Sequence, residues 1–400
     1  MNQRSALERF KPFLRLEETP RPTLRIGGLL ETLERLERPD SNPEIWFERS
    51  LPVKFRLAFA QVEGLQAYAV SFADALPTSC ASKNWLRLTE WKRNFASLDP
   101  RRKIILLKLH GMLGLYWDNE ELFQAAPPAF PRDGGEFSAE FSFLRLSNTQ
   151  MLFEPQINDG FAGMLEVAER APEGARIRLI AALRFMTFNL ERGVVDGRVR
   201  AADRIARAAL ARLKKTEPEE QARIHESKYW RTASYFPFLN KDYAGSAEIL
   251  ARSERLARSA LDMAAATARV FAEENFYAVL ATHVVVESRA GRHAAALSWA
   301  DELVALDPEG SWQRLSRGMA LYELAELDRA REELEACLRL APPCHDEARQ
   351  LLSRCLRGLG RPKEAERLEK EAADLKAKMH LLVNEALTAG NSRVSARRPP

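Results

Sequence analysis

The chain has 400 residues, a formal net charge of +4 at pH 7, and a composition that is 46% hydrophobic and 29% charged. This net charge is too small to indicate nucleic-acid binding by itself, and no apolar run reaches the roughly 18 residues that a membrane-spanning helix requires. Leu, Ala, Arg and Glu dominate the sequence, which favours helix and predicts an all-α fold.

Two further features point to a cytoplasmic protein. The first residues, Met1 to Arg9, contain no apolar segment typical of a secretory signal peptide. The chain has 4 cysteines, too few for a disulfide framework in a protein of this length. We therefore expect a cytoplasmic chain with no membrane partner.

Residues 1–126 predict an N-terminal helical domain. Apolar periodicity runs through 52–76 and 101–117, and Ser41-Asn-Pro-Glu44 fits a capping box at a helix start. The following residues, 127–136, are rich in Pro and Gly. Because these residues stop both helix and strand, we interpret 127–136 as a linker.

Residues 76–125 of that domain contain an arrangement of apolar, basic and aromatic positions. The arrangement comprises Leu76-Pro77, Leu88 to Phe95, and Arg101 to Trp117. It resembles a segment of the helical small subunit of gluconate dehydrogenases. The resemblance implies an alternative function, an accessory subunit of an oxidoreductase complex, although the segment contains no cofactor motif and we expect no cofactor.

Residues 137–262 predict divergent helical-hairpin repeats, the third of which opens with a capping box at Thr216 to Glu219. Aromatic residues in this region, at 229–230 and 235–238, suggest either a binding surface or, more simply, helix packing. The predicted helix pairs are 138–153 with 157–171, 174–192 with 197–215, and 217–237 with 243–262.

The second of those pairs carries a local excess of positive charge. Between Arg176 and Lys215 there are eleven Lys or Arg residues against Glu191, Asp196 and Asp203. A solvated helix surface is the simpler interpretation, and a nucleic-acid-binding helical repeat is the alternative. Aromatic residues are sparse between the basic ones, so we do not expect nucleic acid as a partner.

Residues 263–389 show a regular period. Ala296, Ala330 and Ala365 are 34 and 35 residues apart, and each follows a turn, at 290–291, 324–325 and 359–360. Such spacing is typical of stacked helix–turn–helix units in which small residues let two helices cross closely. The predicted pairs are 264–290 with 293–306, 311–325 with 327–340, and 346–359 with 362–377.

The packing residues of these units resemble those of tetratricopeptide repeats. In the middle unit they are Gly318, Leu321, Leu324, Leu327, Ala330, Leu334 and Pro342. The resemblance implies a right-handed solenoid of stacked antiparallel helix pairs whose concave groove binds a segment of another protein. The sequence departs from the family pattern because the first-helix Trp is not at its usual place; Trp312 is two residues early.

The end of the chain predicts a capping helix and a tail. Residues 362–389 read as one amphipathic helix that covers the last repeat, and residues 390–400 are polar, basic and expected to be disordered.

No sequence motif indicates an enzyme, so we expect no catalytic, cofactor-binding or metal-binding residues. The carboxylates at Asp118, Glu120 and Glu121 fit a helix start better than acid–base catalysis. A zinc site formed by Cys337, Cys344, His345 and Cys355 is the alternative to buried thiols that pack between helices; tight Cys-x-x-Cys pairs are absent and the repeat register favours packing.

The first helix of each regular unit lines the groove of such an array, which predicts the contact residues. Aromatic, Met and Arg side chains are common in protein-binding surfaces, whereas Leu315 and Met319 could instead fill the gap between repeats. We expect a non-enzymatic scaffold or adaptor whose partner is an extended or helical protein segment with apolar and acidic side chains. The predicted groove residues are Arg289, Trp312, Met319, Tyr322, Arg354 and Arg357.

Overall fold

The computed structural model of the chain describes residues 90–112, 119, 121–123, 135–152, 158–264, 269–306, 311–339 and 345–374. Regular secondary structure in these residues is helical and none of it is strand, so the all-α prediction is confirmed for them. Predictions for the residues before 90, for most of the linker and for the C-terminal tail lie outside the described residues.

From residue 136 onward the helices begin and end close to the ranges predicted from the repeat pattern, except that the predicted helix 217–237 is divided into two. They are η5 (Phe95–Ser97), α5 (Pro100–Met112), α7 (Glu136–Leu152), α8 (Asn158–Arg170), α9 (Arg176–Glu191), α10 (Gly197–Thr216), α11 (Glu219–Ala233), α12 (Tyr235–Leu239), α13 (Tyr243–Met263), α14 (Arg269–Arg289), α15 (His293–Leu306), α16 (Ser311–Glu323), α17 (Leu327–Arg339), α18 (His345–Gly358) and a helix over 362–374.

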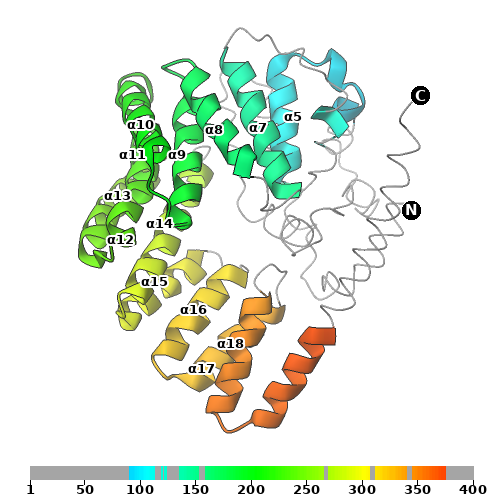
Figure 1. Cartoon of the computed structure of the whole chain (residues 1–400), viewed down its shortest axis with the longest axis vertical. Coiled ribbons are helices and arrows are strands. Elements are labelled where there is room, and N and C mark those ends of the chain that lie inside the picture. The colour runs from blue at the N-terminus through cyan, green and yellow to red at the C-terminus, as the bar shows by residue number, and fades with distance from the viewer. Residues whose placement is uncertain are drawn as a thin grey trace.

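Consecutive helices pack as pairs, and the pairs follow one another around an arc (Figure 1). Alternate helices also touch: α7 contacts α9, α9 contacts α11, α11 contacts α14, α14 contacts α16, and α16 contacts α18. We call α9, α11, α14, α16 and α18 the inner row, because each contacts the next. In Figure 1, α9, α14, α16 and α18 lie nearer the inside of the arc than α10, α13 and α17. The inner row therefore contains the helices for which groove residues were predicted.

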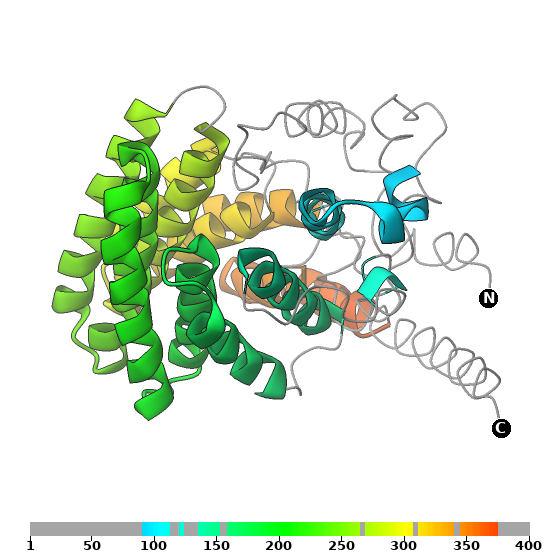
Figure 2. The ribbon, with the colours of Figure 1, turned by 90° about the horizontal axis from the view of Figure 1, so that it is seen from above.

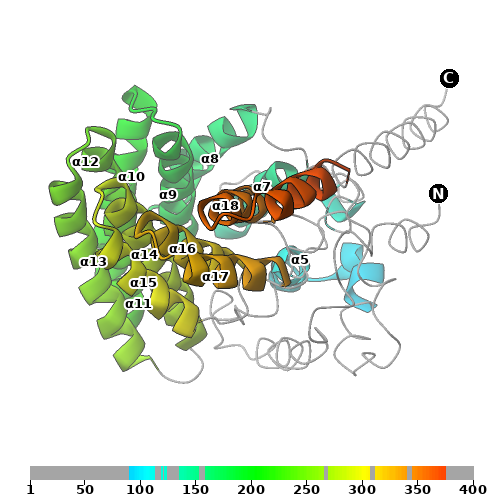
Figure 3. The same cartoon turned by 90° about the horizontal axis from the view of Figure 1, so that it is seen from below.

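Helix direction changes along the array. From above, the helices of the middle region stand side by side (Figure 2). From below, α10 and α13 run up the view while α16 and α17 run across it (Figure 3). Successive pairs are therefore rotated with respect to each other rather than stacked in a flat layer.

The turn that joins the two helices of a pair has one geometry from α9 onward. One residue just after the first helix is left-handed, with φ of 75° at Gly193, 60° at Lys241, 72° at Gly291, 58° at Ala325 and 72° at Gly360. The next amide bonds a carbonyl five residues back, which is the Schellman ending of a helix. These bonds join Val194 N to Asn189 O, Asp242 N to Pro237 O, Arg292 N to Glu287 O, Glu326 N to Leu321 O, and Arg361 N to Leu356 O.

Small residues sit where the helices of a pair cross, as the period predicts. Ala296, Ala330 and Ala365 are each 0% exposed. At Gly318 a Cβ atom would lie 2.9 Å from both Cγ and Cδ2 of Leu334 in α17. The α16–α17 crossing thus has no room for a side chain at Gly318.

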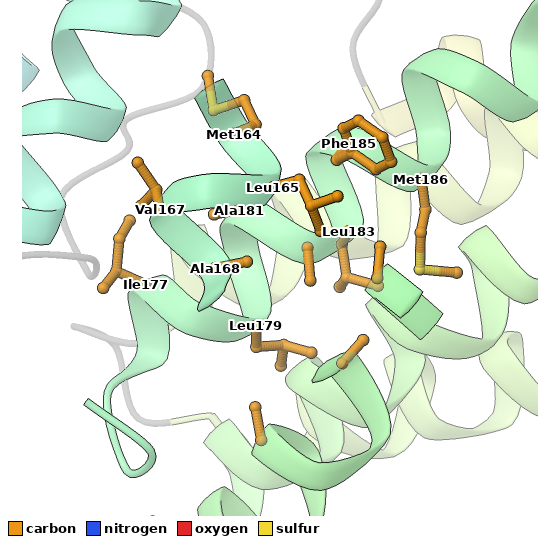
Figure 4. Close-up of a cluster of buried hydrophobic side chains, with 14 of the residues drawn as sticks. Met164, Leu165, Val167, Ala168, Ile177, Leu179, Ala181, Leu183, Phe185 and Met186 are labelled. Carbon is orange, nitrogen blue, oxygen red and sulfur yellow. The ribbon is translucent and has the colours of Figure 1, made fainter. Parts of the chain in front are cut away.

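The core is divided along the array instead of being gathered at one centre. One cluster joins α7 to α12, and Figure 4 shows part of it, with Met164 and Leu165 of α8 beside Leu183, Phe185 and Met186 of α9. Separate clusters lie between α13, α14 and α15 and between α16, α17 and α18. Each helix pair therefore buries its apolar side chains mainly against its neighbours.

The capping box predicted at Thr216 to Glu219 is wrong. Thr216 is the last residue of α10, and its hydroxyl donates to Arg212 O of the same helix at 3.3 Å. The N-cap of α11 is Pro218, without a side-chain cap. Pro218 fixes an extended backbone between the two helices, which leaves Thr216 on the preceding one.

Candidate functional site

The predicted groove residues on α16 include an apolar pair. Trp312 and Met319 are seven residues apart, two helical turns, so they share one side of the helix. Trp312 is 37% exposed and Met319 is 44% exposed. Leu315, the alternative gap-filling residue, is 6% exposed and belongs to the core cluster of α16, α17 and α18. The gap-filling interpretation thus holds for Leu315, while Met319 is left at the surface.

Tyr322 and Arg354 are brought together across neighbouring helices of the inner row. The guanidinium carbon of Arg354 in α18 lies 4.7 Å from the ring centre of Tyr322 in α16, a cation–π contact. The Tyr322 ring also packs against the core cluster, so it is half-buried. This contact holds an exposed cation beside the helix that carries the apolar pair.

The other two predicted arginines differ from each other. Arg357 Nη2 binds Glu369 Oε2 at 2.7 Å, so it links α18 to the helix over 362–374. Glu369 also accepts from the Ser353 hydroxyl. Arg289 is the exposed last residue of α14 and pairs with no residue that the structure describes. Arg289 and Arg354 are therefore the more available cations of the predicted set.

A polar group farther along the inner row was not predicted from the sequence. Arg231 at the end of α11 lies near Tyr235 of α12 and Glu191 of α9, and Tyr235 interacts with Thr282 of α14. The turns at Lys241 and Gly291 are equivalent and lie 50 residues apart. Tyr235 therefore corresponds to Val285, which lies about one helical turn before the predicted groove residue Arg289.

The carboxylate of Glu121 and the imidazole of His110 have separate partners in the described part of the chain. Glu121 is exposed and pairs with Lys92 at 3.3 Å, while Asp118 and Glu120 lie outside the described residues. His110 is buried, 3.1 Å from Asn119 Oδ1. Where side chains are described, no group of three His, Cys, Asp or Glu residues could hold a metal ion.

The described cysteines are packed as the repeat register predicts. Cys337 and Cys355 are each 0% exposed and lie in one core cluster with aliphatic side chains such as Leu334 and Leu352. Burial raises the pKa of the Cys355 thiol to about 11. The thiol therefore stays protonated at neutral pH and acts as a small apolar group.

The basic stretch 176–215 is partly neutralised by carboxylates outside it. Arg176 and Lys214 bind Glu217 and Glu226, respectively. Arg212 pairs with Glu173. Burial opposes ionisation of Glu226, but hydrogen bonds from Lys214, Trp230 and Arg252 outweigh it and lower the pKa of Glu226. The charge excess read from the stretch alone therefore overstates its attraction for phosphates.

The aromatic residues at 229–230 serve helix packing. Tyr229 is 2% exposed, and its hydroxyl donates to Asp203 Oδ1 of α10 at 2.8 Å. Trp230 Nε1 donates to Glu226 at 3.1 Å, and the Arg252 guanidinium lies 3.9 Å from its ring. These side chains join α10, α11 and α13, as the packing interpretation predicts.

None of the helices in the described residues combines the length and apolar character needed to cross a bilayer. Comparison of the chain with models of known protein families finds no match. Comparison with curated proteins likewise finds no match.

Proposed function

We propose that the chain is a cytoplasmic, non-enzymatic scaffold or adaptor, built as a right-handed solenoid similar to tetratricopeptide arrays, that binds a segment of another protein along its inner row. The observation that carries the proposal is the exposed pair Trp312 and Met319 on one side of α16. A large indole ring and a flexible thioether are side chains that bury well against an adaptable partner.

The surroundings of this pair support a partner of defined chemistry. Arg354 lies over Tyr322, and Arg289 is an exposed cation on α14. A segment with apolar side chains would cover Trp312 and Met319, while its acidic side chains would meet the guanidinium groups. The proposed ligand is therefore an extended or helical segment that alternates apolar and acidic residues.

The test is recovery of partners from the native cytoplasm with the tagged full chain. The double variant Trp312→Ala/Tyr322→Ala should lose its specific partners, because it removes the exposed indole of Trp312 and the half-buried ring of Tyr322, both of which we propose contact the bound segment. Far-UV circular dichroism checks that the helices persist.

Two exposed methionines provide a matched control. Met319 is 44% exposed on α16, whereas Met263 is 41% exposed at the end of α13, a helix outside the inner row. Met319→Ala should weaken partner recovery and Met263→Ala should not. Full recovery by the folded Trp312→Ala/Tyr322→Ala variant would remove the groove as the binding surface.

A further inference from the structure

Helix α10, which lies outside the inner row, has basic side chains along one exposed side. Arg200, Arg204 and Lys215 are exposed, and none of them pairs with a residue that the structure describes. Lys215 follows Arg204 by eleven residues and Arg204 follows Arg200 by four, which places all three on the same side of the helix. Exposed Ala208 and Ala211 lie between them on that side. We call these five residues the basic face.

The carboxylates closest to the basic face in the sequence and across the neighbouring helix are engaged elsewhere. Asp203 binds Arg207 at 3.0 Å and accepts from the Tyr229 hydroxyl at 2.8 Å. Glu226 of α11 binds Lys214 at 2.6 Å. Each of these carboxylates neutralises a cation outside the basic face. The three positive charges of the basic face therefore remain.

Helix α17, also outside the inner row, presents the opposite charge. Asp328, Glu332 and Glu335 share one side of the helix and are 76%, 68% and 40% exposed. The nitrogens of Arg331 lie 3.9, 3.9 and 3.6 Å from their oxygens, which is too far for hydrogen bonds. The three carboxylates therefore keep their acceptor oxygens available. We call Asp328, Glu332 and Glu335 the acidic face.

The other arginines near the acidic face have carboxylates of their own. Arg361 binds both oxygens of Glu364, at 2.5 and 2.7 Å. Arg329 pairs with Glu326. Arg331 thus leaves an excess of two negative charges on the acidic face.

We propose that the basic face of one copy of the chain binds the acidic face of a second copy. Arg200 and Arg204 are four residues apart, as are Asp328 and Glu332, so each pair spans about 6 Å along its helix. Two ion pairs can therefore form at once. Because two different faces meet, the contact is heterologous and copies join head to tail. The inner row takes no part in this contact.

A second copy fits the basic face better than a nucleic acid does. The exposed residues between the cations are Ala208 and Ala211, so this face offers no aromatic ring on which a base could stack. Helix α17 supplies carboxylates at the spacing of the arginines, and every copy of the chain carries it. Charge complementarity of this kind favours recognition more than tight binding, so the association is expected to be weak and sensitive to salt.

Sedimentation velocity of the nuclease-treated full chain tests the proposal. Exposed charges act over about 30 Å in 0.01 M salt and over about 3 Å in 1 M salt. The weight-average sedimentation coefficient should rise with protein concentration at the low salt concentration and stay at the monomer value at the high one. A monomer at low salt, or association that persists in 1 M salt, would overturn the proposal.

Reversal of charge on either face should weaken association. Arg200→Glu/Arg204→Glu and Asp328→Lys/Glu332→Lys each place like charges opposite one another, so each should lower the association constant by about tenfold or more. All four side chains are exposed, and far-UV circular dichroism checks that both variants fold. An unchanged association constant in either folded variant would overturn the proposal.

The variant that carries all four substitutions tests whether the two faces meet each other. Two arginines become acidic and two carboxylates become lysines, so its net charge equals that of the wild type. Its association should return to near the wild-type level. The control Arg93→Glu/Arg255→Glu changes net charge as much as the basic-face variant does, at exposed arginines outside α10, and should associate normally. Failure of the fourfold variant to associate, or equal loss in the control, would overturn the proposal.

Other partners give different results. Association that disappears on nuclease treatment would assign the basic face to nucleic acid and overturn the proposal. The Trp312→Ala/Tyr322→Ala variant should associate like the wild type, because α16 lies outside both faces. Loss of association in this variant would place the contact on the inner row and overturn the proposal. Recovery of other proteins through the inner row is a separate measurement, so either proposal can fail without the other.

Discussion

The C-terminal and middle parts of the array differ in what their inner helices present. The α16–α18 part exposes Trp312 and Met319 over a core of aliphatic side chains. The α9–α14 part encloses polar groups instead, among them Ser227, Ser253 and Asn275, which hydrogen-bond to each other out of contact with water. The same pattern of paired helices therefore supports an exposed apolar pair in one part and a buried polar network in the other.

Helix length accounts for part of this difference. The C-terminal helices α16, α17 and α18 have 13, 13 and 14 residues. The middle helices α10, α13 and α14 have 20, 21 and 21. A longer pair has additional turns whose side chains face other helices, and the polar residues on those turns must find partners there. The additional length thus gives room for the buried network of Ser227, Ser253 and Asn275, to which the short C-terminal helices show no equivalent among the described residues.

The largest expected effect is a pH dependence of the unfolding free energy that is caused by His283, in the middle part. His283 is buried and its ring stacks on Trp299, with centroids 4.1 Å apart. Burial lowers its pKa to about 4 from the ordinary 6.5. Between these values the unfolded chain binds a proton that the folded chain does not, so this group's contribution to stability is full above pH 6.5 and is lost as pH falls toward 4. The charged groups around the ring are Glu254, Glu287, Glu302 and Arg258.

Urea unfolding at several pH values measures this effect. Wild type should lose up to about 3 kcal/mol more than His283→Phe between pH 6.5 and pH 4, because one pKa unit corresponds to about 1.4 kcal/mol. The phenyl ring keeps the stack on Trp299 and does not titrate. Parallel pH profiles for the two proteins would contradict the assignment of this dependence to His283.

Added volume should damage the C-terminal part. Gly318→Val places two methyl groups against Leu334, whose Cγ lies 2.9 Å from the position of a Cβ and whose side chain is 0% exposed. Overpacking of this kind costs about 2 kcal/mol of unfolding free energy, measured by urea denaturation. Gly197→Val at the start of α10 is the control, since a Cβ there meets nothing within 4 Å. Equal losses in both variants would mean that the α16–α17 crossing is looser than described.

Removal of a buried hydroxyl should lower the unfolding free energy in the middle part but not in the C-terminal part. Ser227 donates to Ser253 O at 2.9 Å and accepts from Asn275 Nδ2 at 3.0 Å. Ser227→Ala leaves those buried groups short of a partner and should cost about 2 kcal/mol. Ser316 in α16 is 1% exposed and its Oγ has no hydrogen-bond partner, so Ser316→Ala should be neutral or slightly stabilising. A similar cost at both serines would contradict the polar character assigned to the middle part.

The sequence predicts the helices better than the polar contacts between them. The period of small residues predicted the crossings at Ala296, Ala330 and Ala365, because a helix pair that crosses closely has room only for small side chains there. Helical register predicted Trp312 as a groove residue and left Met319 between the groove and the gap between repeats; both are exposed. The approach of Arg231 to Tyr235 and Glu191 could not be predicted, because it depends on how α9, α11 and α12 pack against each other.

Helix starts were also harder to predict from local sequence motifs than the helices themselves. The pattern at Thr216 matched a capping box, yet the helix starts after Pro218. Side-chain caps form at Asp99 before α5, Asp196 before α10 and Asp242 before α13. The last two follow a left-handed residue at the end of the preceding helix, at Gly193 and Lys241. At these two positions a left-handed turn and a side-chain cap occur together.

The smallest expected effect concerns the turns that both parts share. Ala325 has a φ of 58° and Gly360 a φ of 72°, so the same left-handed position is occupied once by a residue with a Cβ and once by glycine. A Cβ in this conformation costs roughly 1–2 kcal/mol, part of which glycine gives back through its greater freedom in the unfolded chain. Ala325→Gly should therefore stabilise the chain by about 0.5–1 kcal/mol in urea unfolding. Gly360→Ala should destabilise it by a similar amount, because the reverse substitution restores the strain. If Ala325→Gly destabilised the protein, this result would contradict the left-handed conformation described for Ala325.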